Sequence, residues 1–382
     1  MQSIEEQPVG QLTEEEMKNQ NQWLEHYKAQ GITSQATLEV MPDIKCLKFV
    51  DDLNVNSLLI QSNCRVSFDI APIIPKNLTI RAAQISIKGL GQMSQLTYLC
   101  IINCALGDIT EISNLSKLSK LILSQNEIQN IDAFKNLLNL SAINLSENKI
   151  QNLDGLNNLL NLNQIDLSDN LIENIEGLQK LKKLTFINLN SNKIQSLKGL
   201  EGLRCLQKIE VNANQISSIK EFDGLRLRSV SLQNNKISNL QGIEGNTEIH
   251  TLHLDNNLIE SVQELDGLQN LQELSLNSNK IQEISALKDH LKLQKLELNS
   301  NMIVNIESLI ENVNLEYLDL DFNQIQNVEV LKYLTNLSCV RLCGNPVIQG
   351  LQDGLHQLVQ FNDKLIYVDN YSNDYLTLND NK

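Results

Sequence analysis

One frame, LxxLxLxxNxI, recurs along most of the chain and constrains the fold more than any other feature. Every interval between frames is 22 residues except the step from Leu206 to Leu227, which is 21 and indicates a one-residue deletion in a turn on the outer side. A short fixed period predicts a repeat architecture, in which each unit buries its apolar face against its neighbours, and the stack should continue through the deletion. The frames open at Leu96, Leu118, Leu140, Leu162, Leu184, Leu206, Leu227, Ile249, Leu271, Leu293, Leu315 and Leu337.

Each frame divides into two parts with different periods. The xLxL portion alternates with period two, as in Ile165 and Leu167, and predicts a short strand with one face inward. After the asparagine, leucines such as Leu153, Leu156 and Leu159 fall three residues apart, which favours 3-10 turns over a long α-helix. Stacking such units predicts a curved α/β solenoid, with a parallel β-sheet on the concave face and short 3-10 or helical returns on the convex face.

The asparagine of the frame is predicted to be structural. Where the chain leaves the strand, buried backbone groups have no partner in the sheet, and an asparagine amide supplies both a donor and an acceptor. Cys104 replaces this asparagine in the first repeat. The predicted asparagine ladder consists of Asn126, Asn148, Asn170, Asn192, Asn214, Asn235, Asn257, Asn279, Asn301, Asn323 and Asn345.

The composition narrows the range of functions. Apolar residues are plentiful and aromatic residues scarce, so the core is predicted to be aliphatic. The formal charge of −15 argues against a general affinity for nucleic acid or for an anionic membrane. The sequence has no run of 18 apolar residues, and its N-terminus lacks the basic flank and apolar stretch of a signal peptide. Its seven cysteines are an odd number without tight terminal clusters. We therefore expect a protein of a reducing compartment, the cytoplasm, with the nucleus as an alternative.

The extended frame LxxLxLxxNxIxxIxxLxxL resembles the leucine-rich repeat family, and among its subclasses the protein phosphatase 1 regulatory subunit and the bacterial internalins. The resemblance covers residues 96–345. It implies a non-catalytic intracellular scaffold that binds a protein on its concave face. One alternative is a regulatory subunit of protein phosphatase 1, with the phosphatase catalytic subunit as partner. Another is an internalin-like adhesin, which is disfavoured because the sequence shows neither an export signal nor a wall-anchoring motif.

The flanking segments depart from the frame. We predict degenerate leucine-rich repeats at residues 46–95 and an N-terminal helical extension at residues 1–45. Its helix begins at the capping box of Thr13 and Glu16, and it either covers the open end of the stack or binds a partner independently. Residues 346–370 resemble the C-terminal cap common in intracellular leucine-rich repeat proteins, and residues 371–382 predict a flexible tail.

No enzyme motif is present, so we predict no catalytic residues and no cofactor. His250, His253 and Asp255 are the nearest approach to a zinc site. Side chains spaced by two or three along a twisted strand diverge, however, and the repeat offers no further ligand, so no metal is predicted. Cys339 and Cys343 are interpreted as two free thiols.

The outward strand positions supply the candidate partner-binding residues. Ten of them are acidic: Glu147, Asp166, Asp169, Glu210, Asp255, Glu273, Glu297, Glu316, Asp319 and Asp321. Five are basic: Lys120, Lys208, Arg228, Lys295 and Arg341. This excess of acid disfavours phosphate ligands and predicts a partner with a basic surface. The outward aromatic residues are Tyr98, Phe186, Tyr317 and Phe322, and exposed aromatic residues are enriched among binding hot spots.

From these columns we predict a partner-binding surface. Aromatic and acidic residues converge near the C-terminal end of the concave face, and the surface is centred there. Phe186, Glu210, Glu297 and Tyr317 also match by type and column what the resemblance to the phosphatase regulatory subunit implies. The predicted surface consists of Phe186, Glu210, Glu297, Tyr317, Asp319, Asp321 and Phe322.

Overall fold

The computed structural model describes residues 37–40, 57–67, 76–349 and 366–367, which belong to two compact units, one up to Asp166 and one from Leu167. The boundary between the units falls inside the run of repeats predicted at 96–345. The predicted N-terminal helix, the tail at 371–382 and most of the predicted C-terminal cap lie outside the described residues. No helix in the described part of the chain is long and apolar enough to cross a membrane.

In the first unit, parallel strands pair in sequence order. They are β1 (Thr37–Val40), β2 (Ser57–Ser67), β3 (Asn77–Ser86), β4 (Tyr98–Ile102), β5 (Lys120–Ile122), β6 (Ala142–Asn144) and β7 (Gln164–Asp166). Short 3-10 helices form the returns: η2 (Leu90–Gln92), η3 (Thr110–Asn114), η4 (Asp132–Phe134) and η5 (Asp154–Leu156). The three-residue spacing of the leucines after each asparagine therefore predicted the type of return correctly.

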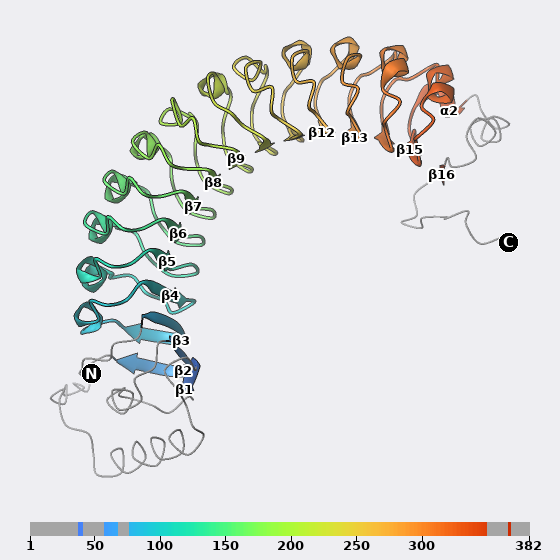
Figure 1. Cartoon of the computed structure of the whole chain (residues 1–382). Coiled ribbons are helices and arrows are strands. Elements are labelled where there is room, and N and C mark those ends of the chain that lie inside the picture. The colour runs from blue at the N-terminus through green and yellow to red at the C-terminus, as the bar shows by residue number, and fades with distance from the viewer. Residues whose placement is uncertain (1–36, 41–56, 68–75, 350–365, 368–382) are drawn as a thin grey trace, which may run out of the picture. The chain divides into compact units, whose positions relative to one another are not determined.

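The second unit repeats this arrangement, and its strands from β8 to β16 pair in parallel in sequence order. Its strands are β8 (Phe186–Asn188), β9 (Lys208–Glu210), β10 (Ser229–Ser231), β11 (Thr251–His253), β12 (Glu273–Ser275), β13 (Lys295–Glu297), β14 (Tyr317–Asp319), β15 (Cys339–Arg341) and β16 (Ile366–Tyr367). Its helices are η6 (Glu176–Leu178), η7 (Lys220–Phe222), η8 (Gln263–Leu265), η9 (Ser285–Leu287), η10 (Glu307–Glu311), η11 (Glu329–Tyr333) and α2 (Pro346–Gln349). Within this unit, the strands line the inner edge of an arc and the returns its outer edge (Figure 1), which confirms the predicted curved solenoid.

Aliphatic side chains fill the space between strands and returns. In the repeat that opens at Leu293, for example, Leu296, Leu298 and Ile303 are completely buried with it. Phe134 and Phe222 are completely buried aromatic residues in the returns, where most other repeats place leucine. The predicted aliphatic core is confirmed, because each repeat buries several such side chains at about 1.5–3 kcal/mol each.

The asparagine ladder has the predicted hydrogen bonds. The Asn192 side-chain nitrogen Nδ2 donates to the carbonyl oxygens of Leu167 (3.0 Å), Leu189 (3.1 Å) and Asn190 (3.1 Å). Its Oδ1 accepts a hydrogen bond of 3.0 Å from the backbone N–H of Ile172. Each such asparagine thus satisfies buried backbone groups of its own repeat and of the preceding one.

Cys104 occupies the ladder position of the first repeat, as predicted. Its buried thiol lies 3.2 Å from the carbonyl oxygen of Ile102, and its N–H donates to Asn126 Oδ1 at 3.1 Å. A thiol is a weak donor, so it reproduces only part of what an amide supplies.

The one-residue deletion falls directly before Leu227, in the turn that leads into β10. The sheet continues through it, because β10 pairs with both β9 and β11. Asn246 stabilises the shortened turn: its Oδ1 accepts from the N–H of Leu227 at 3.2 Å, and its Nδ2 donates to the Phe222 carbonyl at 3.1 Å. This buried asparagine stands where most repeats have leucine.

His290 is a second polar residue at this leucine position, and it is completely buried. Its Nε2 lies 2.9 Å from the Leu265 carbonyl oxygen, whereas its Nδ1 has no hydrogen-bond partner in the described part of the chain. Burial lowers the pKa of His290 below its ordinary value of 6.5, and hydrogen bonds with the Leu265 and Leu287 backbones only partly oppose this effect. The buried imidazole is therefore neutral near pH 7.

Because His290 is buried with a lowered pKa, we expect the free energy of unfolding to decrease at acidic pH. Because its pKa is lower in the folded than in the unfolded state, its contribution to stability is present above pH 6.5 and is lost as the pH falls through the folded-state pKa. We expect His290→Leu to flatten this part of the pH profile and the exposed His250→Leu to leave it unchanged. Denaturant unfolding at a series of pH values measures both, and identical profiles for wild type and His290→Leu would contradict the prediction.

Candidate functional site: the concave face of the second unit

Four of the predicted partner-binding residues form two clusters of the same composition, an aromatic residue, a lysine and a glutamate on adjacent strands. In the first, Lys208 Nζ lies 5.3 Å from the centre of the Phe186 ring and 2.7 Å from Glu210 Oε1. In the second, Lys295 Nζ lies 5.9 Å from the Tyr317 ring centre and 3.1 Å from Glu297 Oε2. Each lysine combines a cation–π contact with an ion pair, so each cluster is nearly neutral.

The second cluster extends toward β12 and β11. Lys295 also lies 3.1 Å from Glu273, which in turn lies 3.4 Å from His253 Nε2. Burial raises the pKa of Glu273, but its hydrogen bond to Lys295 and the charges of Lys295 and His253 outweigh this, so the pKa is lowered overall. Burial, with the charge of Asp319, raises the pKa of Tyr317 to about 12. Tyr317 is therefore a neutral phenol that presents a hydroxyl and a partly accessible ring.

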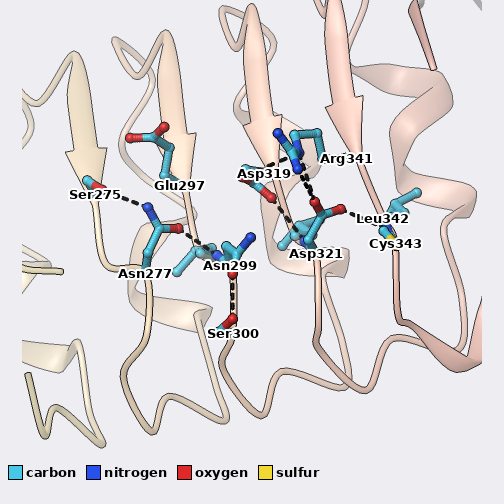
Figure 2. A network of polar contacts seen from close by, with 12 residues as sticks. Ser275, Asn277, Glu297, Asn299, Ser300, Asp319, Asp321, Arg341, Leu342 and Cys343 are labelled. Atoms are coloured by element: carbon cyan, nitrogen blue, oxygen red, sulfur yellow. Dashed lines mark hydrogen bonds and ion pairs between the residues drawn. The ribbon is translucent and has the colours of Figure 1, made fainter. Parts of the chain in front are cut away.

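Asp319 and Asp321 do not present open carboxylates, and here the prediction was wrong. They are only 6% and 1% exposed, because the Arg341 guanidinium from the next strand covers them (Figure 2). Arg341 Nη2 lies 2.7 Å from Asp321 Oδ2, and its Nε lies 3.6 Å from Asp319 Oδ2. Burial raises the pKa of Asp319, partly opposed by a hydrogen bond of 3.0 Å from the N–H of Asp321. The three side chains form a structural ion cluster.

Asp321 also belongs to a second ladder, which sequence reasoning missed. In several repeats the residue two before the ladder asparagine accepts, through Oδ1, the N–H of its counterpart in the next repeat. The recorded bonds are Asn190 from Asn212 (2.7 Å), Asn212 from Gln233 (2.7 Å), Asp255 from Asn277 (2.8 Å), Asn277 from Asn299 (2.8 Å) and Asp321 from Cys343 (2.7 Å). Figure 2 shows the bond between Asn277 and Asn299. The signal was present as the pattern [ND]-x-N, so this column is structural and not free for binding.

Phe322 is the most accessible of the predicted aromatic residues. Its column, directly before the ladder asparagine, has a left-handed backbone in the repeats from Gln125 to Gly344, and most of its members are small or polar. Phe322 has φ 54° and is 51% exposed. A Cβ atom on Gly344, the counterpart in the next repeat, would lie 2.6 Å from Phe322 Cδ1, so the ring lies against a site that only glycine leaves open. Bulky residues rarely adopt this conformation, and such strain is concentrated at functional sites.

The predicted surface is thus divided by the fold. Tyr317 and Glu297 lie together on β14 and β13, with Phe322 beyond the end of β14, whereas Phe186 and Glu210 form the separate cluster on β8 and β9. Two of the three residues nearest to a zinc site, His253 and Asp255, contact other groups of the protein instead. His253 pairs with Glu273, Asp255 serves in the second ladder, and no group of three or more His, Cys, Asp or Glu within the described ranges could hold a metal ion.

Known proteins resemble this chain in sequence pattern and in fold. A family model for leucine-rich repeats (two copies) matches residues 225–267. An internalin of Listeria monocytogenes is 26% identical, with a TM-score of 0.60 over 69% of this chain and 86% of its own. A leucine-rich repeat protein of Leptospira interrogans is 21% identical, with a TM-score of 0.70 over 85% and 93% of the two chains. The Drosophila Toll–Spatzle complex gives 19% identity and a TM-score of 0.69, over 87% of this chain and 50% of the other. Among curated protein sequences, none gives a significant match.

Proposed function

Since the chain is a leucine-rich repeat protein, we propose that it is a non-catalytic scaffold that binds another protein on the concave face of the unit beginning at Leu167. The observation that supports this most is Phe322, a strained and half-exposed aromatic residue that follows β14 in the same repeat as Tyr317. Leaving such a ring in water is unfavourable, and a partner that covers it gains apolar burial at a fixed position. In the Toll structure, a protein of this fold is in complex with Spatzle.

The charge around these aromatic residues favours a partner with a basic surface. Lys295 and Arg341 are two cations among five carboxylates, which leaves a formal charge of −3: Glu273, Glu297, Glu316, Asp319 and Asp321. Glu316 is exposed, whereas the aspartates are covered. Basic residues of the partner therefore approach Glu316 and the half-buried glutamates, and the field of the whole cluster accelerates their encounter.

Alanine substitutions of the two aromatic residues test the proposal. We expect Tyr317→Ala with Phe322→Ala to weaken binding at least about tenfold, because both rings are anchors in the proposed interface. The partner is identified by affinity capture and mass spectrometry, and its affinity is then measured by surface plasmon resonance. Tyr333→Ala is the matched control, since Tyr333 is 49% exposed but lies on the return helix η11. Equal affinity for the double variant and wild type would exclude this site.

A regulatory subunit of protein phosphatase 1 is a second candidate, favoured by the two aromatic–lysine–glutamate clusters. They place Phe186 with Glu210, and Tyr317 with Glu297, on the concave side of the same unit. Isothermal titration with the phosphatase catalytic subunit tests it directly. Phe186→Ala, in the cluster distant from Phe322, should reduce the affinity as much as Tyr317→Ala, and failure to bind would exclude this candidate alone.

An intracellular setting, in the cytoplasm or nucleus, is part of the proposal and rests on the cysteines. The cysteines that the structure describes, Cys100, Cys104, Cys205, Cys339 and Cys343, are not joined in disulfides. We expect the denatured native protein, treated with an alkylating reagent without reductant, to take up seven alkyl groups, one for each cysteine of the chain. Mass spectrometry counts them. A bridge between Cys339 and Cys343 would contradict this setting.

A further inference from the structure

Three basic residues each directly follow the last buried leucine of a return, in three consecutive repeats, at the edge where the chain enters the strands. They are Lys182, Arg204 and Arg226, here called the basic row, and all three are exposed. Each follows a buried leucine whose N–H closes the preceding return: Leu181 to Leu178 (2.9 Å), Leu203 to Leu200 (3.1 Å) and Leu225 to Phe222 (3.1 Å). The turn backbone is equivalent at Lys182 and Arg204, where the N–H of Leu184 donates to Leu181 and that of Leu206 to Leu203, whereas Arg226 lies in the shortened turn directly before Leu227. The three side chains follow one another along the same edge of three consecutive repeats.

The surroundings of the row are also basic. Lys180, Lys183 and Arg228 lie within two residues of row members and are exposed, whereas the acids at this edge are Glu201, Asp223 and Glu248. Six cations against three carboxylates leave a local formal charge of +3 in a chain whose net charge is −15. This local excess of positive charge is opposite in sign to the net charge of the chain and to the cluster around Tyr317.

The row is only weakly neutralised by its neighbours. Lys182 Nζ donates to the Glu201 carbonyl oxygen at 3.1 Å, while the Glu201 carboxylate accepts from the N–H of Gly199 at 2.6 Å. Glu248 pairs with Arg228 at 3.0 Å. Within the part of the chain that the structure describes, Arg204 and Arg226 have no ion-pair partner within 4.0 Å. Two guanidinium groups, each with five donors, are therefore available at one repeat spacing.

We propose that the basic row is a second interaction surface, which binds an acidic segment of a polypeptide running along the stack. Strands in a sheet are about 4.8 Å apart, and alternate side chains of an extended peptide are about 6.8 Å apart, so carboxylates on an extended chain can each reach a row cation. Single-stranded nucleic acid is disfavoured because its binding sites combine cations with aromatic stacking platforms, and the residues directly before and after each member of the row are leucine, lysine or cysteine. This surface lies at the strand-entry edge and is separate from Tyr317 and Phe322.

Fluorescence anisotropy with a labelled oligoglutamate peptide tests this inference on the full chain. Wild type should bind the probe, and added salt should weaken binding because the contacts are ionic. Reversing the row, with Lys182→Glu, Arg204→Glu and Arg226→Glu, should reduce the affinity at least about tenfold. The matched control reverses Lys193, Lys236 and Lys280 to Glu, because these exposed lysines follow the strands at the opposite edge and give the same change in net charge.

Each outcome decides the proposal. Loss with the row variant and retention with the control supports it. It is overturned by equal loss in both variants, which indicates a general charge effect, by no binding to wild type, or by preferential binding of a labelled oligonucleotide or of anionic phospholipid vesicles. Should the row variant fold poorly by circular dichroism, the single change Arg204→Gln provides the same comparison, with Lys236→Gln as its control.

Discussion

Replacing Arg341 by methionine should lower the free energy of unfolding by about 3–5 kcal/mol, because it removes the only cation over two buried carboxylates in the cluster described above. Asp321 would keep its hydrogen bond from the Cys343 N–H at 2.7 Å, and Asp319 its bond from the Asp321 N–H. Neither bond compensates an unpaired negative charge out of water. Since Arg341 itself is partly exposed, the expected loss lies toward the lower value. Urea unfolding monitored by circular dichroism measures it.

The pH dependence of this loss distinguishes charge from packing. Without Arg341, the pKa of at least one aspartate rises further in the folded state, so the variant recovers stability as the pH falls below that folded-state pKa toward the unfolded value. Arg228→Met is the control, since its ion pair with Glu248 is about half exposed on both sides and exposed pairs contribute about 0–1 kcal/mol. A loss at Arg341 that is the same at acidic and neutral pH would show that lost packing is responsible.

Asn148→Ala should destabilise the first unit by about 2–4 kcal/mol, because several buried backbone groups lose their partner together. Asn148 Nδ2 donates to the carbonyls of Leu123 (2.9 Å), Leu145 (3.0 Å) and Ser146 (3.1 Å), and its Oδ1 accepts from the Ile128 N–H (3.0 Å). The N–H of Ile128 would lose this acceptor inside the core, which is the costliest consequence.

Asn158 provides the comparison for Asn148 within the same repeat. It is exposed on the return, so Asn158→Ala should change the free energy of unfolding by less than about 0.5 kcal/mol. Denaturant unfolding of both variants measures the two changes in the free energy of unfolding. If the two substitutions cost the same, the ladder asparagines do not stabilise the turns as their geometry indicates.

The fold was predictable because the spacing of apolar residues within each repeat differs between the strand and the return. Alternation at Ile165 and Leu167 gave the strand, the three-residue spacing around Leu156 gave η5 (Asp154–Leu156), and the unsatisfied turn backbone gave the asparagine ladder. Each of these is a local pattern whose physical cause acts over a few residues. Repetition then supplied the stacking.

The candidate site was harder to predict because its contacts cross between repeats. Asp321 and Arg341 are 20 residues apart in sequence, and only their side-chain conformations decide that one covers the other. An outward position in the repeat predicts an exposed side chain, which holds for Phe322 but fails for Asp319 and Asp321. The lysines of the two clusters were counted as charges, although they also contact aromatic rings. The amino-acid sequence alone does not show these side-chain conformations or the contacts that they make between repeats.

The second ladder has a consequence for how a protein of this kind acquires new partners. It commits the column of Asn190, Asn212 and Asp255 to joining repeats, and the neighbouring left-handed column restricts which side chains are tolerated there. Substitutions during evolution are then least constrained at the first and third residues of strands such as β11, with Thr251 and His253, whereas the third residues Asp319 of β14 and Arg341 of β15 are held in the ion cluster. Specificity can diverge through these two columns while the scaffold stays intact, so a library randomised at them alone is the efficient way to redirect this surface toward a chosen target.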